Sequence, residues 1–194
     1  MQRAQVAESV ARHRGDALII AGPGATSGTL WAAGHRPGTI YNMEMSYALP
    51  MALGVALTRP GQRVVSMEGE GSAIAGLAGL ATVARYAPEN LCAVVYDNQV
   101  YGTGGGEVAT ATAYGLDVVA VAEACGWDPE RMIRIVDVRL LEDWVVKALT
   151  EPGPWLLVAD VDRVDSQSGQ RPTPGIDHVE AAAAFGRTAT GRVS

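Results

Sequence analysis

The sequence predicts an α/β domain of three layers, in which a doubly wound, mainly parallel sheet carries helices on both faces. Three observations predict this fold class. Short apolar segments rich in Val, Ile and Leu recur along the chain and mostly do not alternate with polar residues, as in strands buried on both faces. Segments with helical content separate them. The 194 residues, 48% of them hydrophobic, are enough for one domain with a large core and too few for two ordinary ones.

Each predicted element follows from this alternation. The strands are expected at Ala17–Ala21, Arg63–Met67, Leu91–Tyr96, Met132–Val136 and Trp155–Val161. The helices are expected at Gln2–His13, Glu44–Thr58, Ser72–Tyr86, Asp117–Cys125 and Leu140–Leu149, with Pro50 tolerated or causing a bend in the second. Right-handed crossovers would place these helices on both faces, and ligands would bind at the carboxyl ends of the strands.

The last segment of the chain differs in composition from the rest. Residues 165–194 are rich in Gly, Pro, Ser and Thr around one short apolar helix at Val179–Phe185. We therefore divide the chain into a folded domain, residues 1–164, and a C-terminal extension, residues 165–194, that is partly flexible or binds a partner.

Composition excludes several classes of function. A net charge of −6 with singly scattered arginines argues against nucleic-acid binding. No apolar run approaches the roughly 20 residues that span a bilayer, so no membrane partner is expected. Cys92 and Cys125 form neither a metal-binding pair nor a secreted disulfide framework, which predicts a reducing, cytoplasmic location. The three histidines, His13, His35 and His178, are expected mainly as surface residues.

Two polar motifs follow neighbouring predicted strands. Glu70 lies between Gly69 and Gly71 in "GEGS", and Asn98 lies in "YDNQVYG". Because both loops fall on the same edge of a parallel sheet, their carboxylate and amide oxygens should converge, and such hard ligands suit Mg²⁺. The two glycines allow close approach of the main chain, and Ser72 near a helix N-terminus favours an anion. Together these features predict a diphosphate site.

At these residues the sequence resembles the diphosphate-binding domain of thiamine-diphosphate-dependent enzymes. The resemblance rests on "GEGS" at 69–72, "YDNQVYG" at 96–102 and "MEMSYALPMALGVALTRPGQRVV" at 43–65. It extends over about residues 22–162, and "APENLCAVVYDNQVYGTGGG" is most similar to small (beta) subunits and C-terminal domains of sulfopyruvate and phosphonopyruvate decarboxylases. It implies a thiamine-diphosphate-binding fold, with thiamine diphosphate and Mg²⁺ as cofactors.

The resemblance also assigns roles to individual residues. It implies that Glu70 and Asn98 bind Mg²⁺ through their side chains and Val100 through its carbonyl. Met45 would wedge beneath the cofactor and force its two rings into a V. The residues that it implies around the diphosphate are Gly69, Gly71, Ser72, Ala73, Tyr101, Gly102 and Thr103.

The sequence departs from the family pattern at two places. Glu70 replaces the usual aspartate, so the metal site must accommodate one more methylene. Met43 and Glu44 replace the small residues that usually precede the wedge, and Glu44 could be either a substrate-facing acid or a solvated residue near a helix start.

The resemblance implies a lyase: the diphosphate-binding subunit of a two-chain 2-oxo acid decarboxylase with a substrate similar to sulfopyruvate or phosphonopyruvate. The family's activating glutamate belongs to a pyrimidine-binding domain that this sequence lacks, so a separate alpha subunit is expected, in an α2β2 or larger assembly. A carboligase subunit and a non-catalytic interaction subunit are the alternatives. An iron–sulfur oxidoreductase subunit is disfavoured, because Cys92 and Cys125 are poorly placed for a cluster.

Overall fold

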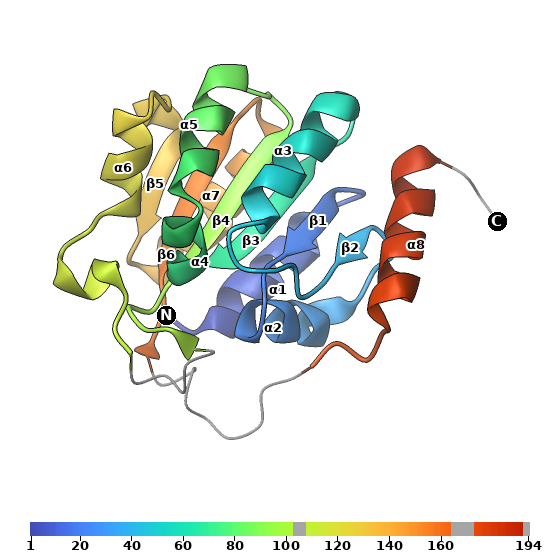
Figure 1. Ribbon diagram of the computed structural model, residues 1–194, viewed down its shortest axis with the longest axis horizontal. Coiled ribbons are helices and arrows are strands. Elements are labelled where there is room, and N and C mark those ends of the chain that lie inside the picture. The colour runs from blue at the N-terminus through green and yellow to red at the C-terminus, as the bar shows by residue number, and fades with distance from the viewer. Residues whose placement is uncertain (103–107, 164–172, 192–194) are drawn as a thin grey trace.

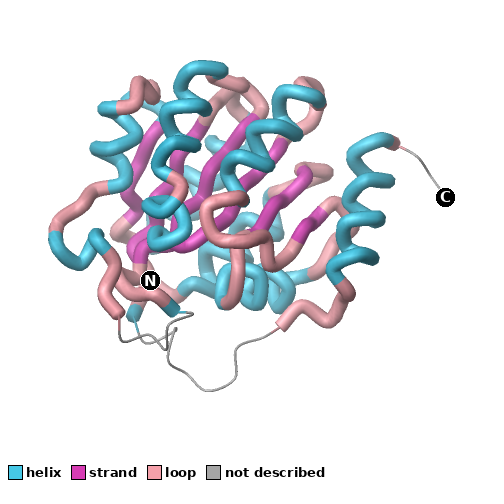
Figure 2. The backbone as a smooth tube through the Cα atoms, viewed as in Figure 1, coloured by secondary structure: helices cyan, strands magenta, loops and turns pink. Residues whose placement is uncertain are grey.

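The computed structural model describes residues 1–102, 108–163 and 173–191. In this part of the chain, six parallel strands form a single sheet in the order β2-β1-β3-β4-β6-β5 (Figures 1 and 2). The strands are β1 (Leu18–Ala21), β2 (Thr39–Ile40), β3 (Val64–Gly69), β4 (Leu91–Asp97), β5 (Met132–Ile135) and β6 (Trp155–Asp160). The predicted fold class, a doubly wound parallel sheet between two helical layers, is confirmed.

Helices cover both faces of this sheet (Figure 1). One face carries α1 (Arg3–His13), α2 (Ala25–Gly34) and α7 (Val138–Thr150). The other carries α3 (Ala48–Thr58), α4 (Glu70–Ala75), α5 (Leu77–Tyr86) and α6 (Val118–Ala124), with short 3-10 turns η2 at Ala111–Tyr114 and η3 at Pro129–Arg131. None of the helices in the described ranges is long and apolar enough to cross a membrane.

The core consists of two apolar clusters separated by the sheet. Successive residues of β1 contribute to opposite clusters, Leu18 and Ile20 to one and Ile19 and Ala21 to the other. Every residue of β4 is buried. Because both faces are covered, the strands need no polar residue at alternate positions, which explains the continuous apolar runs in the sequence.

The structure corrects several predicted boundaries. The helix expected at Ser72–Tyr86 is two helices, α4 and α5, that meet at Gly76, where a Cβ atom would lie 3.0 Å from the carbonyl oxygen of Ser46. The helix expected from Glu44 begins at Ala48, because Ser46 has a left-handed backbone with a φ of 74°. Pro50 thereby falls in the first turn of α3, where its missing N–H breaks no helical hydrogen bond.

The tail helix is longer than its apolar pattern predicted. It is α8 (His178–Thr190), which begins after Asp177, whose carboxylate caps the N–H groups of Val179 and Glu180. Figure 1 shows α8 beside β2 at the edge of the sheet, and its Ala181 and Phe185 side chains are buried. Whether residues 165–194 also contact a partner stays a prediction.

Helix α1 is joined to α7 by a polar cluster around Glu142. Ser9 Oγ donates to one carboxylate oxygen at 2.8 Å, Arg12 Nη1 donates to the other at 2.9 Å, and His13 Nε2 also contacts it. The hydrogen bond from His13, followed by those from Ser9 and Arg12, lowers the pKa of Glu142 from 4.5 to about 2. The fold therefore favours the ionised carboxylate.

The lowered pKa predicts an acid-dependent contribution to stability. This contribution is complete above the unfolded pKa of about 4.5 and is lost as the pH falls toward about 2. The Glu142 side chain is 43% exposed, so solvent screens these interactions. Their contribution to the free energy of unfolding is at most about 1 kcal/mol, or roughly 2–4 °C in Tm. Glu142→Gln should lower the Tm by that amount at pH 7, with a deficit that shrinks below pH 5. Thermal unfolding of both proteins at several pH values checks this; a constant deficit would contradict it.

Candidate functional site

A pocket lies at the carboxyl edge of the sheet, where the strand order changes direction. From β1 the chain runs to β2 on one side and later to β3 on the other, so the loops after β1 and β3 diverge. The space between them is about 510 Å³, its open mouth included. Predicted site residues that line it are Met45, Gly69, Glu70, Gly71, Ser72, Asn98, Val100, Tyr101 and Gly102.

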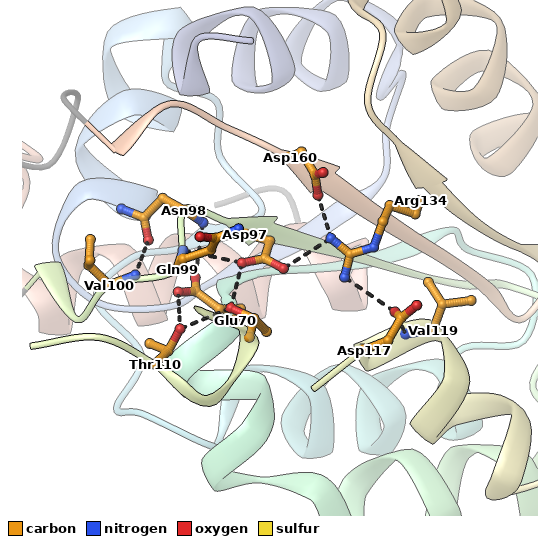
Figure 3. Close-up of polar contacts among 11 residues, drawn as sticks. Glu70, Asp97, Asn98, Gln99, Val100, Thr110, Asp117, Val119, Arg134 and Asp160 are labelled. Carbon is orange, nitrogen blue, oxygen red and sulfur yellow. Dashed lines mark hydrogen bonds and ion pairs between the residues drawn. The ribbon is translucent and has the colours of Figure 1, made fainter. Parts of the chain in front are cut away.

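Three oxygen atoms converge on one side of this pocket. The side-chain oxygen of Asn98 lies 3.2 Å from Glu70 Oε1 and 2.9 Å from the carbonyl oxygen of Val100 (Figure 3). The Val100 N–H donates to this same amide oxygen at 3.3 Å. With the Asn98 amide turned over, its NH₂ group would instead donate to Glu70 and Val100.

Which orientation the Asn98 amide takes depends on what faces it in the pocket. Without a cation, the turned-over amide satisfies both neighbours, and its oxygen would also accept from Arg3 Nη2 at 3.3 Å; with a cation between the three groups, the amide oxygen would face them instead. In an octahedral Mg²⁺ site with bonds of 2.0–2.1 Å, neighbouring ligand oxygens are about 2.9 Å apart. The set of one carboxylate, one amide and one carbonyl therefore fits Mg²⁺. No cluster of three His, Cys, Asp or Glu side chains in the described ranges offers an alternative metal site.

Glu70 is almost completely buried at the first position of α4. Its Oε1 accepts a hydrogen bond from the Thr110 hydroxyl at 2.9 Å, and its Oε2 accepts one from the Asn98 N–H at 3.5 Å. Burial raises the pKa of Glu70, while the Thr110 hydrogen bond acts in the opposite direction. A bound cation would favour the ionised form and offset the cost of burial.

Gly71 allows the opposite wall of the pocket to close tightly. A Cβ atom on this residue would lie 2.4 Å from Tyr101 Cε1 and 2.8 Å from Tyr101 Cδ1. The ring of Tyr101 therefore packs directly on the main chain that begins α4. The first N–H groups of a helix have no acceptor among its own carbonyls, and Gly71 and Ser72, near the start of α4, line the pocket.

The Ser72 hydroxyl forms hydrogen bonds to other residues of the protein. It donates to Glu68 Oε2 at 2.5 Å and accepts from the Ser46 N–H at 2.9 Å, so α4 is tied to the loop that carries Met45. Glu68 is buried, and burial raises its pKa to about 7. Ser72 can thus offer a ligand only its backbone.

A second polar network lies beside Glu70 (Figure 3). Asp97, at the end of β4, is buried and accepts from Thr112 Oγ1 at 2.8 Å and from Arg134 Nη1 at 3.1 Å. Arg134, on β5, also contacts Asp160 and donates to Asp117 at 3.2 Å. Arg134 therefore neutralises the buried negative charge of Asp97 beside Glu70.

Other predicted residues lie elsewhere. Ala73 packs in a core cluster and is not part of the pocket wall, and Thr103 lies outside the described residues. Glu44 is exposed and is not among the residues that line the pocket. None of the three histidines lines the pocket where the structure describes it.

Four lining residues were not predicted: Arg3, Pro23, Ala25 and Thr26. The last three follow β1, so the rule that strands deliver ligands at their carboxyl ends could have identified them. Arg3, the first residue of α1, is buried with its guanidinium 5.3 Å from the centre of the Tyr96 ring. No local sequence signal marks it, because its proximity to Asn98 depends on the tertiary fold.

Comparisons with known proteins agree on one family. The family model described as "Thiamine pyrophosphate enzyme, C-terminal TPP binding domain" matches residues 24–159. Phosphonopyruvate decarboxylase from Streptomyces viridochromogenes is 36% identical over 143 residues, which are 73% of this chain and 35% of that protein. Sulfopyruvate decarboxylase subunit beta from Methanothermobacter thermautotrophicus is 33% identical over 138 residues, 71% of each chain.

A solved structure shows the same fold. Benzoylformate decarboxylase from Polynucleobacter necessarius superposes with a TM-score of 0.65 at 19% identity, over 81% of this chain and 32% of that one. The chain thus spans about a third of the length of that enzyme and of the phosphonopyruvate decarboxylase. It spans about seven tenths of the beta subunit.

Proposed function

Since the chain belongs to the thiamine pyrophosphate enzyme family, matching its C-terminal cofactor-binding domain, we propose that it is the diphosphate-binding chain of a 2-oxo acid decarboxylase. Thiamine pyrophosphate is the same compound as thiamine diphosphate. The observation that carries the proposal is the convergence of the Glu70 carboxylate, the Asn98 side-chain amide and the Val100 carbonyl, with one end of the amide 3.2 Å from Glu70 Oε1 and 2.9 Å from the Val100 oxygen. Likeness to phosphonopyruvate and sulfopyruvate decarboxylases supports a small anionic 2-oxo acid as substrate.

Different residues of the pocket would bind different parts of the cofactor. Glu70, Asn98 and the Val100 carbonyl would hold the metal, and the backbone at Gly71 and Ser72 would face the diphosphate. Met45 would support the cofactor from below. When bound, thiamine diphosphate supplies an electron sink for the electrons left by loss of CO₂.

The proposal includes a second chain as the source of a catalytic acid. Glu70 is the one acidic side chain on the described pocket wall, and its carboxylate is committed to the metal. An acid that activates the pyrimidine ring must therefore come from elsewhere. The name of the relative from Methanothermobacter, a beta subunit, supports a partner alpha subunit. We propose that this partner carries the pyrimidine-binding domain and the acid, in an α2β2 or larger cytoplasmic assembly.

Titration calorimetry tests the cofactor assignment: the purified chain is titrated with thiamine diphosphate, once in the presence of Mg²⁺ and once in the presence of EDTA. The same titrations on a complex with the co-purifying partner, followed by CO₂ release from sulfopyruvate, phosphonopyruvate and pyruvate, test the reaction. We expect Mg²⁺-dependent binding and release of CO₂ from an anionic 3-substituted pyruvate by the complex. Binding that is indifferent to EDTA, or a complex that binds the cofactor without releasing CO₂, would overturn the proposal.

Gly71→Ala should weaken cofactor binding roughly tenfold or more, because the added Cβ atom must displace the Tyr101 ring from the pocket wall. Calorimetry with Mg²⁺ and thiamine diphosphate measures the loss. Gly54→Ala is the matched control, since a Cβ atom there has no neighbour within 4 Å. Equal affinities of the two variants would show that the contact between Gly71 and Tyr101 does not shape the site.

A further inference from the structure

Glu70 presents a geometric problem that an aspartate would not. Its side chain has one more methylene and one more rotatable bond, yet its carboxylate must meet a metal that tolerates little deviation from octahedral distances near 2.1 Å. A longer side chain loses more conformational freedom when it is fixed. Some neighbouring group must therefore hold the carboxylate in position.

Thr110 makes the contact that can do this. Its side chain is buried, and its hydroxyl donates to Glu70 Oε1 at 2.9 Å. Oε1 is also the carboxylate oxygen that lies 3.2 Å from the Asn98 amide oxygen. One hydrogen bond thus fixes the oxygen that faces the other metal ligands (Figure 3).

The backbone places Thr110 against the loop that carries the other ligands. The Thr110 N–H donates to the Gln99 carbonyl at 3.0 Å, and the Tyr101 N–H donates to the Val108 carbonyl at 2.8 Å. These bonds flank an antiparallel bridge between Val100 and Ala109. Thr110 and the metal-binding carbonyl of Val100 therefore belong to one small hydrogen-bonded unit.

The buried network behind Thr110 limits where its proton can point. Thr110 Oγ1 lies 3.0 Å from Thr112 Oγ1, and Thr112 Oγ1 donates to Asp97 at 2.8 Å. Each hydroxyl has one proton to donate. Because Thr112 donates its proton to Asp97, the contact between the two hydroxyls does not need the proton of Thr110, which is donated to Glu70. Arg134 in turn neutralises Asp97 and fixes it to β5 and β6.

We propose that Thr110 is a positioning residue that fits the long side chain of Glu70 to the metal site. It acts through Glu70 and does not touch the cation. The inference rests on the proposed function, since it assumes that the converging oxygens hold a divalent cation. It explains how Glu70 can bind the metal in this chain at the position where the family usually has an aspartate.

The test uses Mn²⁺, counted by electron paramagnetic resonance, with thiamine diphosphate present, on the full chain and on its complex with the partner. Thr110→Val, of nearly equal shape, should weaken Mn²⁺ binding about 10–100-fold. Thr110→Ser, which keeps the hydroxyl, should restore most of the affinity. Thr82→Val is the matched control, because the Thr82 hydroxyl is exposed and bonds only within α5.

A double-mutant cycle with Glu70→Asp separates positioning from general stability. An aspartate that reaches the metal would be too short to reach Thr110, so Thr110→Val should have little further effect in that background. Equal binding by Thr110→Val and the parent, or the same loss in both backgrounds, would overturn the inference and leave the proposed function standing. Absence of Mn²⁺ binding by the parent chain and its complex would overturn both.

Discussion

Replacing Asn98 with alanine should abolish Mg²⁺-dependent binding of thiamine diphosphate and leave the fold intact. The substitution removes one of three converging oxygens, so the metal would lose a protein ligand and the diphosphate its bridge to the protein. Removal of a residue that hydrogen-bonds to a metal ligand commonly lowers the affinity for the metal 10–100-fold, so removal of a direct ligand should lower it by more than about 100-fold. Asn98 follows the last residue of β4 and packs in neither core cluster, so the sheet should persist.

Asn98→Asp provides the conservative comparison, because it keeps an oxygen at the same place and should retain binding. Calorimetry with thiamine diphosphate at fixed Mg²⁺ gives the affinities, and thermal unfolding without cofactor reports on the fold. An Asn98→Ala protein that folds normally and binds the cofactor as tightly as the parent would remove Asn98 from the metal site.

The sequence predicts the centre of the fold better than its edges. Strands such as β3 and β4 were located within one or two residues, because burial on both faces leaves a continuous apolar run. The edge strand β2 has two residues and produces no such run. Helix α2 was not predicted, because "ATSGTLWAAG" combines glycines, Ser and Thr with buried positions that give almost no amphipathic pattern.

The site shows the same limit of local information. Glu70 and Asn98 could be brought together because adjacent parallel strands end at one edge of the sheet. Thr110 lies 40 residues from Glu70, and the two meet only through the pairing of residue 109 with residue 100. Arg3 reaches the pocket from a helix at the far end of the sequence. Such contacts depend on tertiary packing, and a single sequence holds no signal for them.

The second large effect concerns the partner chain. The isolated chain should exchange the thiazolium proton of thiamine diphosphate no faster than the free cofactor does in water. Its described pocket offers one acid, Glu70, which the metal would occupy, and Glu44 is exposed outside the pocket. A partner that supplies a glutamate to the pyrimidine ring should accelerate exchange by about 10²–10⁴-fold, the usual contribution of general acid–base assistance.

Deuterium exchange at the thiazolium carbon, followed by quenched-flow NMR, is the most direct measurement of the two-chain mechanism. The parent chain, its Glu44→Gln variant and the complex of the parent with its partner would be compared at saturating Mg²⁺. We predict slow exchange by both isolated chains and fast exchange by the complex. Fast exchange by the parent chain alone, lost in Glu44→Gln, would contradict the mechanism and place the activating acid within this chain.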